Sequence, residues 1–304
     1  MNNRRLILAI IISAITGAVI ISCKTQFATT KDTYTATVSD ARFERGKVLT
    51  YSICGGCHYD RVTNKFIGAP IHDIPGIAGK VVSANLTHSK TGVTDHYTDA
   101  EIRYLLKTGV ARDGRFFNYM LRPNMADEDI NAIIVYLRSN DAAVQADGTT
   151  VGVTHLTFIG KAYMNLKAKP VPYKADVKLP SDGNHVAMGY YLVDNLGCFH
   201  CHSKKLTSLN YQYPDQTKGY LAGGIKFKGE NETMVKAANI TPDKNTGIGD
   251  FTQEQFLRAM KEGITPEGGK LKPPMPKFKM LKNEEINDIY AYLQTVPAKV
   301  HAIK

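Results

Sequence analysis

Five residue positions carry the strongest chemical signal in this chain of 304 residues, and they occur twice. The pattern Cys-x-x-Cys-His appears at Cys54-Gly55-Gly56-Cys57-His58 and again at Cys198-Phe199-His200-Cys201-His202. Two thiols three positions apart on a helical turn can both reach the vinyl groups on one edge of a porphyrin, and the next histidine can present its imidazole to the iron. The pattern therefore predicts two covalently bound haems c, one at each motif.

Paired cysteines have three other common uses. A thioredoxin-type redox pair needs a βαβ setting, of which the sequence has no sign. A zinc site needs four ligands in one place, whereas each copy holds its own pair. Disulfides could form if the chain is exported. Haem is favoured over all three because a histidine follows the second cysteine in both copies.

Each iron needs a sixth ligand, and methionine in a stiff loop is suited to that role. In the second copy, Met275 lies between Pro274 and Pro276, about 75 residues after His202, and the proline rings restrict the loop. We therefore predict His202 and Met275 as the two axial ligands of the second iron. Met280 lies closer to the last predicted helix, and we expect it to pack in the core.

The sixth ligand of the first iron is less directly marked. The loop 114–125 contains Met120 and Met125. Counting back from the last helix of each copy aligns Met125 with Met280, the methionine that we expect to pack in the core. Met120 then aligns with Met275, if the first copy is about two residues shorter before the helix. We predict His58 and Met120 as ligands, with Met125, His88 and His96 as rivals.

The two motifs lie inside longer segments that repeat. Ala84-Asn85-Leu86-Thr87 matches Ala238-Asn239-Ile240-Thr241 at an offset of 154, and Tyr97-Thr98 matches Phe251-Thr252 at the same offset. A near-constant offset over about 90 residues indicates a tandem duplication of a domain rather than a short-period repeat.

Helix signals recur in both copies. Capping boxes begin at Thr98 and Thr252, and Gly109 and Gly263 end the apolar faces that follow. Further helices are expected before each cysteine pair and at the end of each copy, over 41–52, 186–195 and from Asp127 and Asn283 onward. Because the alternation typical of strands is scarce, these signals predict an all-α fold.

The first residues resemble an export signal. Arg4-Arg5 precedes Leu6–Ser22, a run of 17 residues without charge, which is short for a membrane-spanning helix of about 20 residues. Cys23 follows a small residue, as in the bacterial lipobox, so we expect this cysteine to carry lipid; an uncleaved signal anchor is the alternative. Either way the rest of the chain would lie on the periplasmic side of a bacterial membrane.

A family resemblance rests on the second copy. Residues 237–297, with Ala238-Asn239-Ile240-Thr241-Pro242-Asp243 and Pro274-Met275-Pro276, resemble the cytochrome c subunits of membrane-bound bacterial alcohol, aldehyde and gluconate dehydrogenases. The resemblance covers about 46–139 and 189–297. It implies class I-type cytochrome c domains with His/Met iron, and it implies that Asn85 and Asn239 lie in loops beside the haem propionates.

The chain departs from that family in two respects. The family commonly carries three haem sites and this chain has two, and the first copy lacks a Met-Pro dipeptide. The dehydrogenase partner therefore does not carry over directly. The expected organisation is a signal segment (1–23), a tether (24–40), a first cytochrome c domain (41–140), a linker (141–185) and a second cytochrome c domain (186–304).

Electron transfer is the function that these features favour. The alternatives are a dihaem enzyme of the peroxidase or thiosulfate dehydrogenase type, which needs one reactive iron, and a haem-based sensor. Expected partners are a dehydrogenase as donor and an oxidase or another cytochrome as acceptor. The net charge is +10, from 38 basic and 28 acidic residues, but no basic run exceeds two residues, so nucleic acid is not an expected partner.

Overall fold

The computed structural model describes residues 26–71, 74, 76–149, 151–167, 169–228 and 233–301. The predicted signal segment and Cys23 therefore lie outside the described residues. Within these ranges, none of the helices is both long enough and apolar enough to cross a membrane. We refer to residues 26–149 as the N-terminal half and to residues 169–301 as the C-terminal half.

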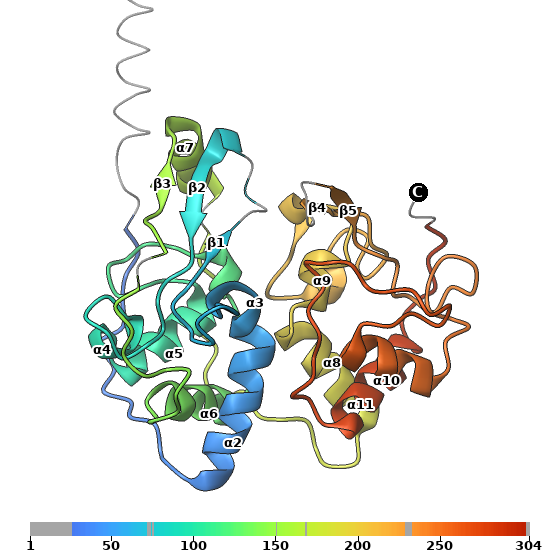
Figure 1. Ribbon diagram of the computed structural model, residues 1–304, viewed down its shortest axis with the longest axis horizontal. Helices are drawn as coiled ribbons and strands as arrows, with labels where there is room; N and C mark the ends of the chain where they lie inside the picture. The colour runs from blue at the N-terminus through green and yellow to red at the C-terminus, as the bar shows by residue number, and fades with distance from the viewer. Residues whose placement is uncertain are drawn as a thin grey trace, which may run out of the picture.

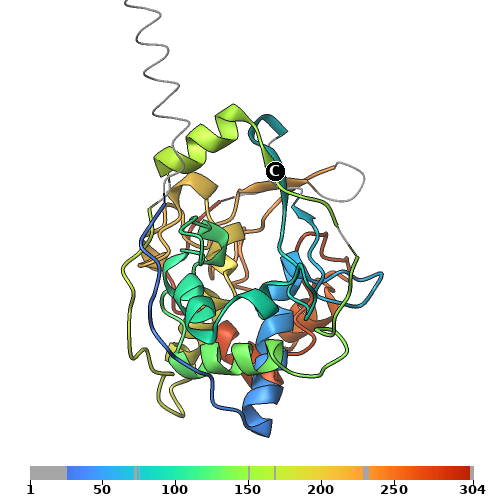
Figure 2. The same ribbon diagram turned by 90° about the vertical axis from the view of Figure 1, so that its left-hand side faces the viewer.

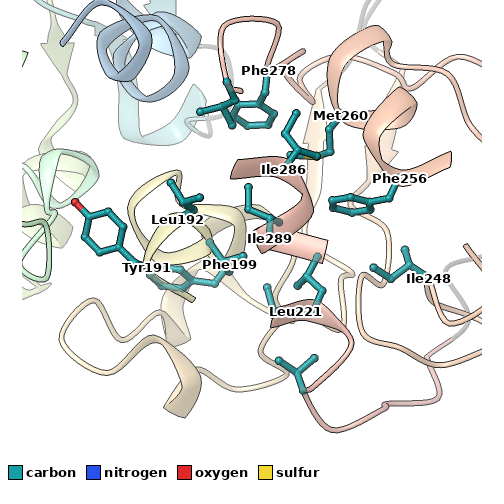
Figure 3. Packing of buried hydrophobic residues seen from close by; sticks show 14 of the residues in the cluster. Tyr191, Leu192, Phe199, Leu221, Ile248, Phe256, Met260, Phe278, Ile286 and Ile289 are labelled. Atoms are coloured by element: carbon teal, nitrogen blue, oxygen red, sulfur yellow. The ribbon is translucent and has the colours of Figure 1, made fainter. Parts of the chain in front are cut away.

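Each half is built on a pair of packed helices. In the N-terminal half α2 (Asp40–Leu49) packs against α6 (Asp127–Leu137), and in the C-terminal half α8 (His185–Asn195) packs against α11 (Asn283–Leu293) (Figure 1). Buried hydrophobic side chains form one cluster in each half. Figure 3 shows part of the C-terminal cluster, in which Leu192 of α8 lies beside Ile286 and Ile289 of α11.

A glycine allows each helix pair to approach closely. A Cβ atom on Gly46 of α2 would lie 1.9 Å from the carbonyl oxygen of Ala132, and one on Gly189 of α8 would lie 1.9 Å from that of Asp288. Neither distance is compatible with a side chain, because both obstacles are backbone atoms. Both helix pairs therefore have a glycine at the point where the two helices cross.

Substituting Gly189 tests this crossing. We expect Gly189→Ala to lower the free energy of unfolding by about 2 kcal/mol, because the added methyl group forces α8 away from α11. Gly148→Ala is the matched control, since its Cβ would meet nothing within 4 Å. Urea denaturation followed by circular dichroism measures both. Equal stability of the two variants would contradict the close approach.

The predicted capping boxes are confirmed. Helix α5 (Asp99–Thr108) begins at Thr98 and ends at Gly109, and α10 (Gln253–Glu262) begins at Thr252 and ends at Gly263. Both glycines are left-handed, with φ of 77° and 73°, which a glycine adopts without steric cost.

The segments around the cysteines are short helical turns. After α2, a π-helical turn η1 (Thr50–Cys54) leads into α3 (Gly55–His58), and in the C-terminal half α9 (Cys198–Cys201) follows α8. The other short helices of the described chain are α4 (Val93–His96), η2 (Gly76–Ala78), η3 (Asn118–Met120), η4 (Leu206–Ser208) and η5 (Pro214–Gln216).

The all-α prediction is incomplete, because short strands also occur. Strands β1 (Pro70–Ile71), β2 (Gly79–Val82) and β3 (His155–Leu156) form an antiparallel sheet, and β4 (Lys226–Lys228) pairs with β5 (Met234–Lys236). Strands of two to four residues are too short for an alternating pattern to be recognised.

The expected linker 141–185 also contains regular structure. Strand β3 extends the sheet of β1 and β2, and it is followed by α7 (Phe158–Lys167). Figures 1 and 2 both show α7 beside β2 and β3 at one end of the molecule. The segment therefore packs on the N-terminal half as a folded element.

A buried polar network joins the two halves. The hydroxyl of Tyr191 donates to Asp129 at 2.7 Å, and Figure 3 shows it pointing out of its own half toward the green ribbon of the other. Arg45 donates two hydrogen bonds to the same carboxylate, at 2.9 and 3.0 Å, and a third to Glu285 of α11. Because Asp129 is buried, these partners replace the water that its charge would otherwise need.

Candidate functional site

The histidine of each Cys-x-x-Cys-His motif is held by a backbone carbonyl. Nδ1 of His58 lies 2.7 Å from the carbonyl oxygen of Ala84, and Nδ1 of His202 lies 2.8 Å from that of Ala238. A carbonyl only accepts, so Nδ1 must carry the proton and Nε2 keeps its lone pair. Burial lowers the pKa of both imidazoles, which favours the neutral form that binds metal.

Two glycines bring those carbonyls within reach. Gly68 N donates to the carbonyl oxygen of His58 at 2.9 Å, and Gly223 N donates to that of His202 at 2.8 Å. A Cβ on Gly223 would lie 2.4 Å from the very carbonyl oxygen that holds His202. The sequence reasoning missed both glycines, although their offset of 155 is close to that of the repeat.

The two predicted asparagines order the loops that follow these carbonyls. Oδ1 of Asn239 accepts from Thr241 N at 3.0 Å, and its Nδ2 donates to the carbonyl oxygen of Lys299 at 2.7 Å. Oδ1 of Asn85 likewise accepts from Thr87 N at 2.8 Å. Both side chains are buried, so their amides hold the loop in shape immediately after the residue that orients the imidazole.

The four cysteines of the motifs form two separate pairs, one in each half, and no disulfide joins any of them. Burial raises the pKa of the thiols of Cys54 and Cys198 to about 12. A redox-active pair of the thioredoxin type needs a lowered pKa, so this environment does not favour that chemistry. The thiols within each motif span one short turn, as two-point attachment to one ring requires.

Each methionine loop is closed by two backbone hydrogen bonds to the helix before it. In the N-terminal half Phe117 N donates to the carbonyl oxygen of Gly109 at 2.7 Å, and Arg122 N donates to that of Leu106 at 2.6 Å. The corresponding bonds in the C-terminal half, each 2.8 Å long, run from Leu271 to Gly263 and from Phe278 to Met260.

These bonds place Met120 and Met275 in equivalent positions. Each lies between the two closing bonds of its loop, and each is partly buried against the cluster of its own half. Met125 lies after the second bond and is fully buried in the core, as predicted. The prediction that Met280 packs in the core is wrong: its side chain is 40% exposed, because the adjacent Leu281 fills the core position.

The rival histidines are bound elsewhere in their own loop. Nδ1 of His88 lies 3.1 Å from a carboxylate oxygen of Asp95, and Nε2 of His96 lies 2.6 Å from the carbonyl oxygen of Lys90. His96 is exposed, whereas His88 is partly buried and its Nε2 is buried without a hydrogen-bond partner. The assignment of Met120 as a ligand stays a prediction, and His88 stays its rival.

The donor groups fit a haem c in both halves. Each half offers an imidazole whose Nε2 keeps its lone pair for a metal, a partly buried thioether on a loop anchored at both ends, and two thiols on one helical turn. When bound there, haem c would supply reversible one-electron chemistry at its iron.

Arg122 lies between the two motifs. Its guanidinium donates to the carbonyl oxygens of Asn195 at 2.8 Å, Leu121 at 2.7 Å and Tyr119 at 3.2 Å. Burial lowers the pKa of Arg122, while the thiols of the first motif oppose that shift. Burial also lowers the pKa of His200 in the second motif, and the charge of Arg122 lowers it further. One buried cation therefore faces both candidate sites, which the sequence reasoning did not find.

Removing Arg122 should disturb both halves. We expect Arg122→Leu to lower the free energy of unfolding by about 3 kcal/mol, because buried carbonyls lose a charged donor. Arg122→Lys should restore only part of this loss, since an ammonium group cannot replace a planar guanidinium that donates to several carbonyl oxygens. The control is Arg115→Leu, whose exposed ion pair with Asp113 contributes less than about 1 kcal/mol. A loss no larger than that of the control would show that Arg122 is dispensable.

Comparison with known proteins confirms the resemblance to dehydrogenase cytochromes. The fructose dehydrogenase cytochrome subunit of Gluconobacter japonicus is 32% identical over 141 residues, which is 45% of this chain and 26% of that protein. The gluconate 2-dehydrogenase cytochrome c subunit of Pantoea cypripedii is 33% identical over 109 residues, 35% of this chain and 22% of that protein.

A shorter relative has two haems by its name. The diheme cytochrome c-type protein of Cereibacter sphaeroides is 28% identical over 103 residues, 33% of this chain and 32% of that protein. No family model matches the chain. The chain spans about a quarter of the length of the dehydrogenase cytochrome subunits that it matches.

Proposed function

We propose that this chain is an electron-transfer protein with two covalently bound haems c. His58 and Met120 ligate one iron, and His202 and Met275 ligate the other. The single observation that carries the proposal is the bond from Nδ1 of each motif histidine to an alanine carbonyl, because it orients a neutral imidazole for metal binding in both halves.

In this proposal the two halves are tandem class I-type cytochrome c domains. The repeated helix pairs, capping boxes and methionine loops support a duplication, with boundaries near 41–140 and 186–304. With an imidazole and a thioether as protein ligands, each haem iron would have no position left for a substrate, so this proposal assigns electron transfer and not catalysis to both domains. The two irons would form a short path for electrons, with the buried charge of Arg122 between them.

We further propose that the donor is a dehydrogenase and the acceptor a component of a respiratory chain. The similarity to cytochrome subunits of fructose and gluconate dehydrogenases supports a donor of that class. The apolar run before Cys23 supports export to the periplasmic side of a membrane and lipid attachment at this cysteine. Mass spectrometry of the purified full-length chain would detect the lipid on Cys23.

The haem content tests the proposed function. The purified protein is expected to carry two haems per chain that remain attached through acid–acetone extraction, because thioether bonds survive this treatment. Changing Cys54 and Cys57 to serine should remove one covalent haem, and changing Cys198 and Cys201 should remove the other. Each double variant is the control for the other. Extraction of either haem from the unchanged chain would contradict covalent attachment.

Carbon monoxide distinguishes electron transfer from catalysis at iron. If both irons have two protein ligands, the reduced protein should bind the gas slowly or not at all. Fast binding at one haem would instead favour a dihaem enzyme with one accessible iron.

A further inference from the structure

Helix α7 presents an exposed apolar face outside both candidate haem sites. Phe158, Ile159, Tyr163 and Leu166 are 60, 52, 47 and 74% exposed. At 100° per residue these four side chains fall within an arc of about 140° on the helix. A contiguous row of large apolar side chains in water is unfavourable, and it marks a surface that another apolar phase covers.

The orientation of this face is set by close packing on the opposite side of the helix. A Cβ on Gly160 would lie 2.0 Å from the carbonyl oxygen of Ala78, so the backbone of α7 lies directly on the turn η2. Thr157 adds two bonds to the same turn, from its N to the carbonyl oxygen of Ala78 at 3.1 Å and from its Oγ1 to that of Ile77 at 2.6 Å. The apolar face therefore points away from the protein.

The charged residues of the segment that contains α7 are all basic. Lys161 and Lys167 flank the apolar face and are exposed. Between Asp147 and Asp176 the sequence contains four lysines, Lys161, Lys167, Lys169 and Lys174, and no carboxylate. An apolar helix face bordered by lysines is the pattern of helices that lie in a membrane interface, where the lysines meet lipid phosphates.

The start of the described chain lies at the same end of the molecule. Figures 1 and 2 show its blue start close to α7. Tyr104 contacts both the start of the described chain and the segment that follows α7, since its hydroxyl donates to the carbonyl oxygen of Ala28 at 3.1 Å and its ring stacks on Tyr173. The apolar run Leu6–Ser22 ends four positions before Gln26, a reach of at most about 14 Å.

We propose that the apolar face of α7 lies on an anionic lipid bilayer. Phe158, Ile159, Tyr163 and Leu166 enter the interface, and Lys161 and Lys167 contact the phosphates. This contact orients the folded chain on the membrane instead of leaving it free on a tether. It is independent of the haems, but it relies on the proposed anchoring of the chain at its N-terminus.

The lack of tryptophan in the chain makes a direct test simple. The full-length holoprotein carrying Leu166→Trp is reconstituted into phosphatidylcholine–phosphatidylglycerol vesicles, with or without bromine on the acyl chains. Brominated lipid quenches an inserted indole, and the ratio of the two intensities cancels any quenching by haem. We expect about twofold lower fluorescence in brominated vesicles.

Two matched variants complete the experiment. Val186→Trp, on α8 in the other half of the protein, should show no quenching by bromine while the chain floats equally with the vesicles. Adding Lys161→Glu and Lys167→Glu to the Leu166→Trp chain should reduce the quenching, because the flanking charges then repel the lipid.

The outcomes separate anchoring from docking. Flotation with selective quenching of Leu166→Trp supports the proposal. Flotation with equal quenching by bromine in Leu166→Trp and Val186→Trp overturns the docking proposal but leaves the anchor intact. The apolar face would then be assigned to a protein partner. A chain that does not float contradicts both the anchor and the docking, while its haem content still tests the electron-transfer proposal separately.

Discussion

A His202→Ala chain is expected to keep two covalent haems but to lose the low-spin spectrum of one of them. The thioethers at Cys198 and Cys201 are independent of the imidazole, whereas the strong nitrogen ligand on the proximal side is removed. Absorption spectra and the haem-to-protein ratio measure the two effects separately. The reduction potential of that site should change as well, because axial ligands set it.

The control is the neighbouring histidine of the same motif. The ring of His200 packs against Phe199 and Tyr211, with ring centroids 4.4 and 4.9 Å apart, and no carbonyl orients it toward a metal. His200→Ala should therefore leave both haems low-spin. A spectrum that changes in His200→Ala and not in His202→Ala would reverse the assignment of the proximal ligand.

Substitution of the two methionines in the N-terminal half should separate ligation from packing. Met120→Ala is expected to remove about half of the weak sulfur-to-iron absorption band in the far red, because one of two Met-ligated irons loses its sulfur. Its loss of packing should be small, since the side chain is only partly buried, so any fall in the free energy of unfolding reports the lost sulfur–iron bond. Spectra of the oxidised protein and urea denaturation measure the two properties.

Met125→Ala should show the opposite behaviour. Its side chain is fully buried in the core, so the free energy of unfolding should fall by about 3 kcal/mol while the band stays intact. Met280→Ala should change neither, because that side chain is 40% exposed. An unchanged sulfur-to-iron band in Met120→Ala would contradict the assignment of Met120 as a ligand and would favour an enzyme with one accessible iron.

Local patterns in the sequence predicted local structure well. The capping boxes at Thr98 and Thr252 and the left-handed glycines that end α5 and α10 are all present, because a cap depends only on residues three or four positions apart. Predictions from sequence patterns failed where the structure depends on residues that meet only in the folded chain. Strand β3 exists because Gly79 and Leu156 meet across 77 positions, and Met280 turns outward because Leu281 takes its place in the core.

The sequence by itself predicts the chemistry of the two sites, because the spacing of Cys-x-x-Cys-His follows from the order of residues and is the same in any fold. Only the tertiary structure decided how that chemistry is oriented. The carbonyls that hold His58 and His202 lie 26 and 36 positions further along the chain, and Arg122 reaches Asn195 over 73 positions. Such contacts depend on where the backbone crosses itself, as at Gly46 and Gly189, and a pattern of neighbouring residues does not encode those crossings.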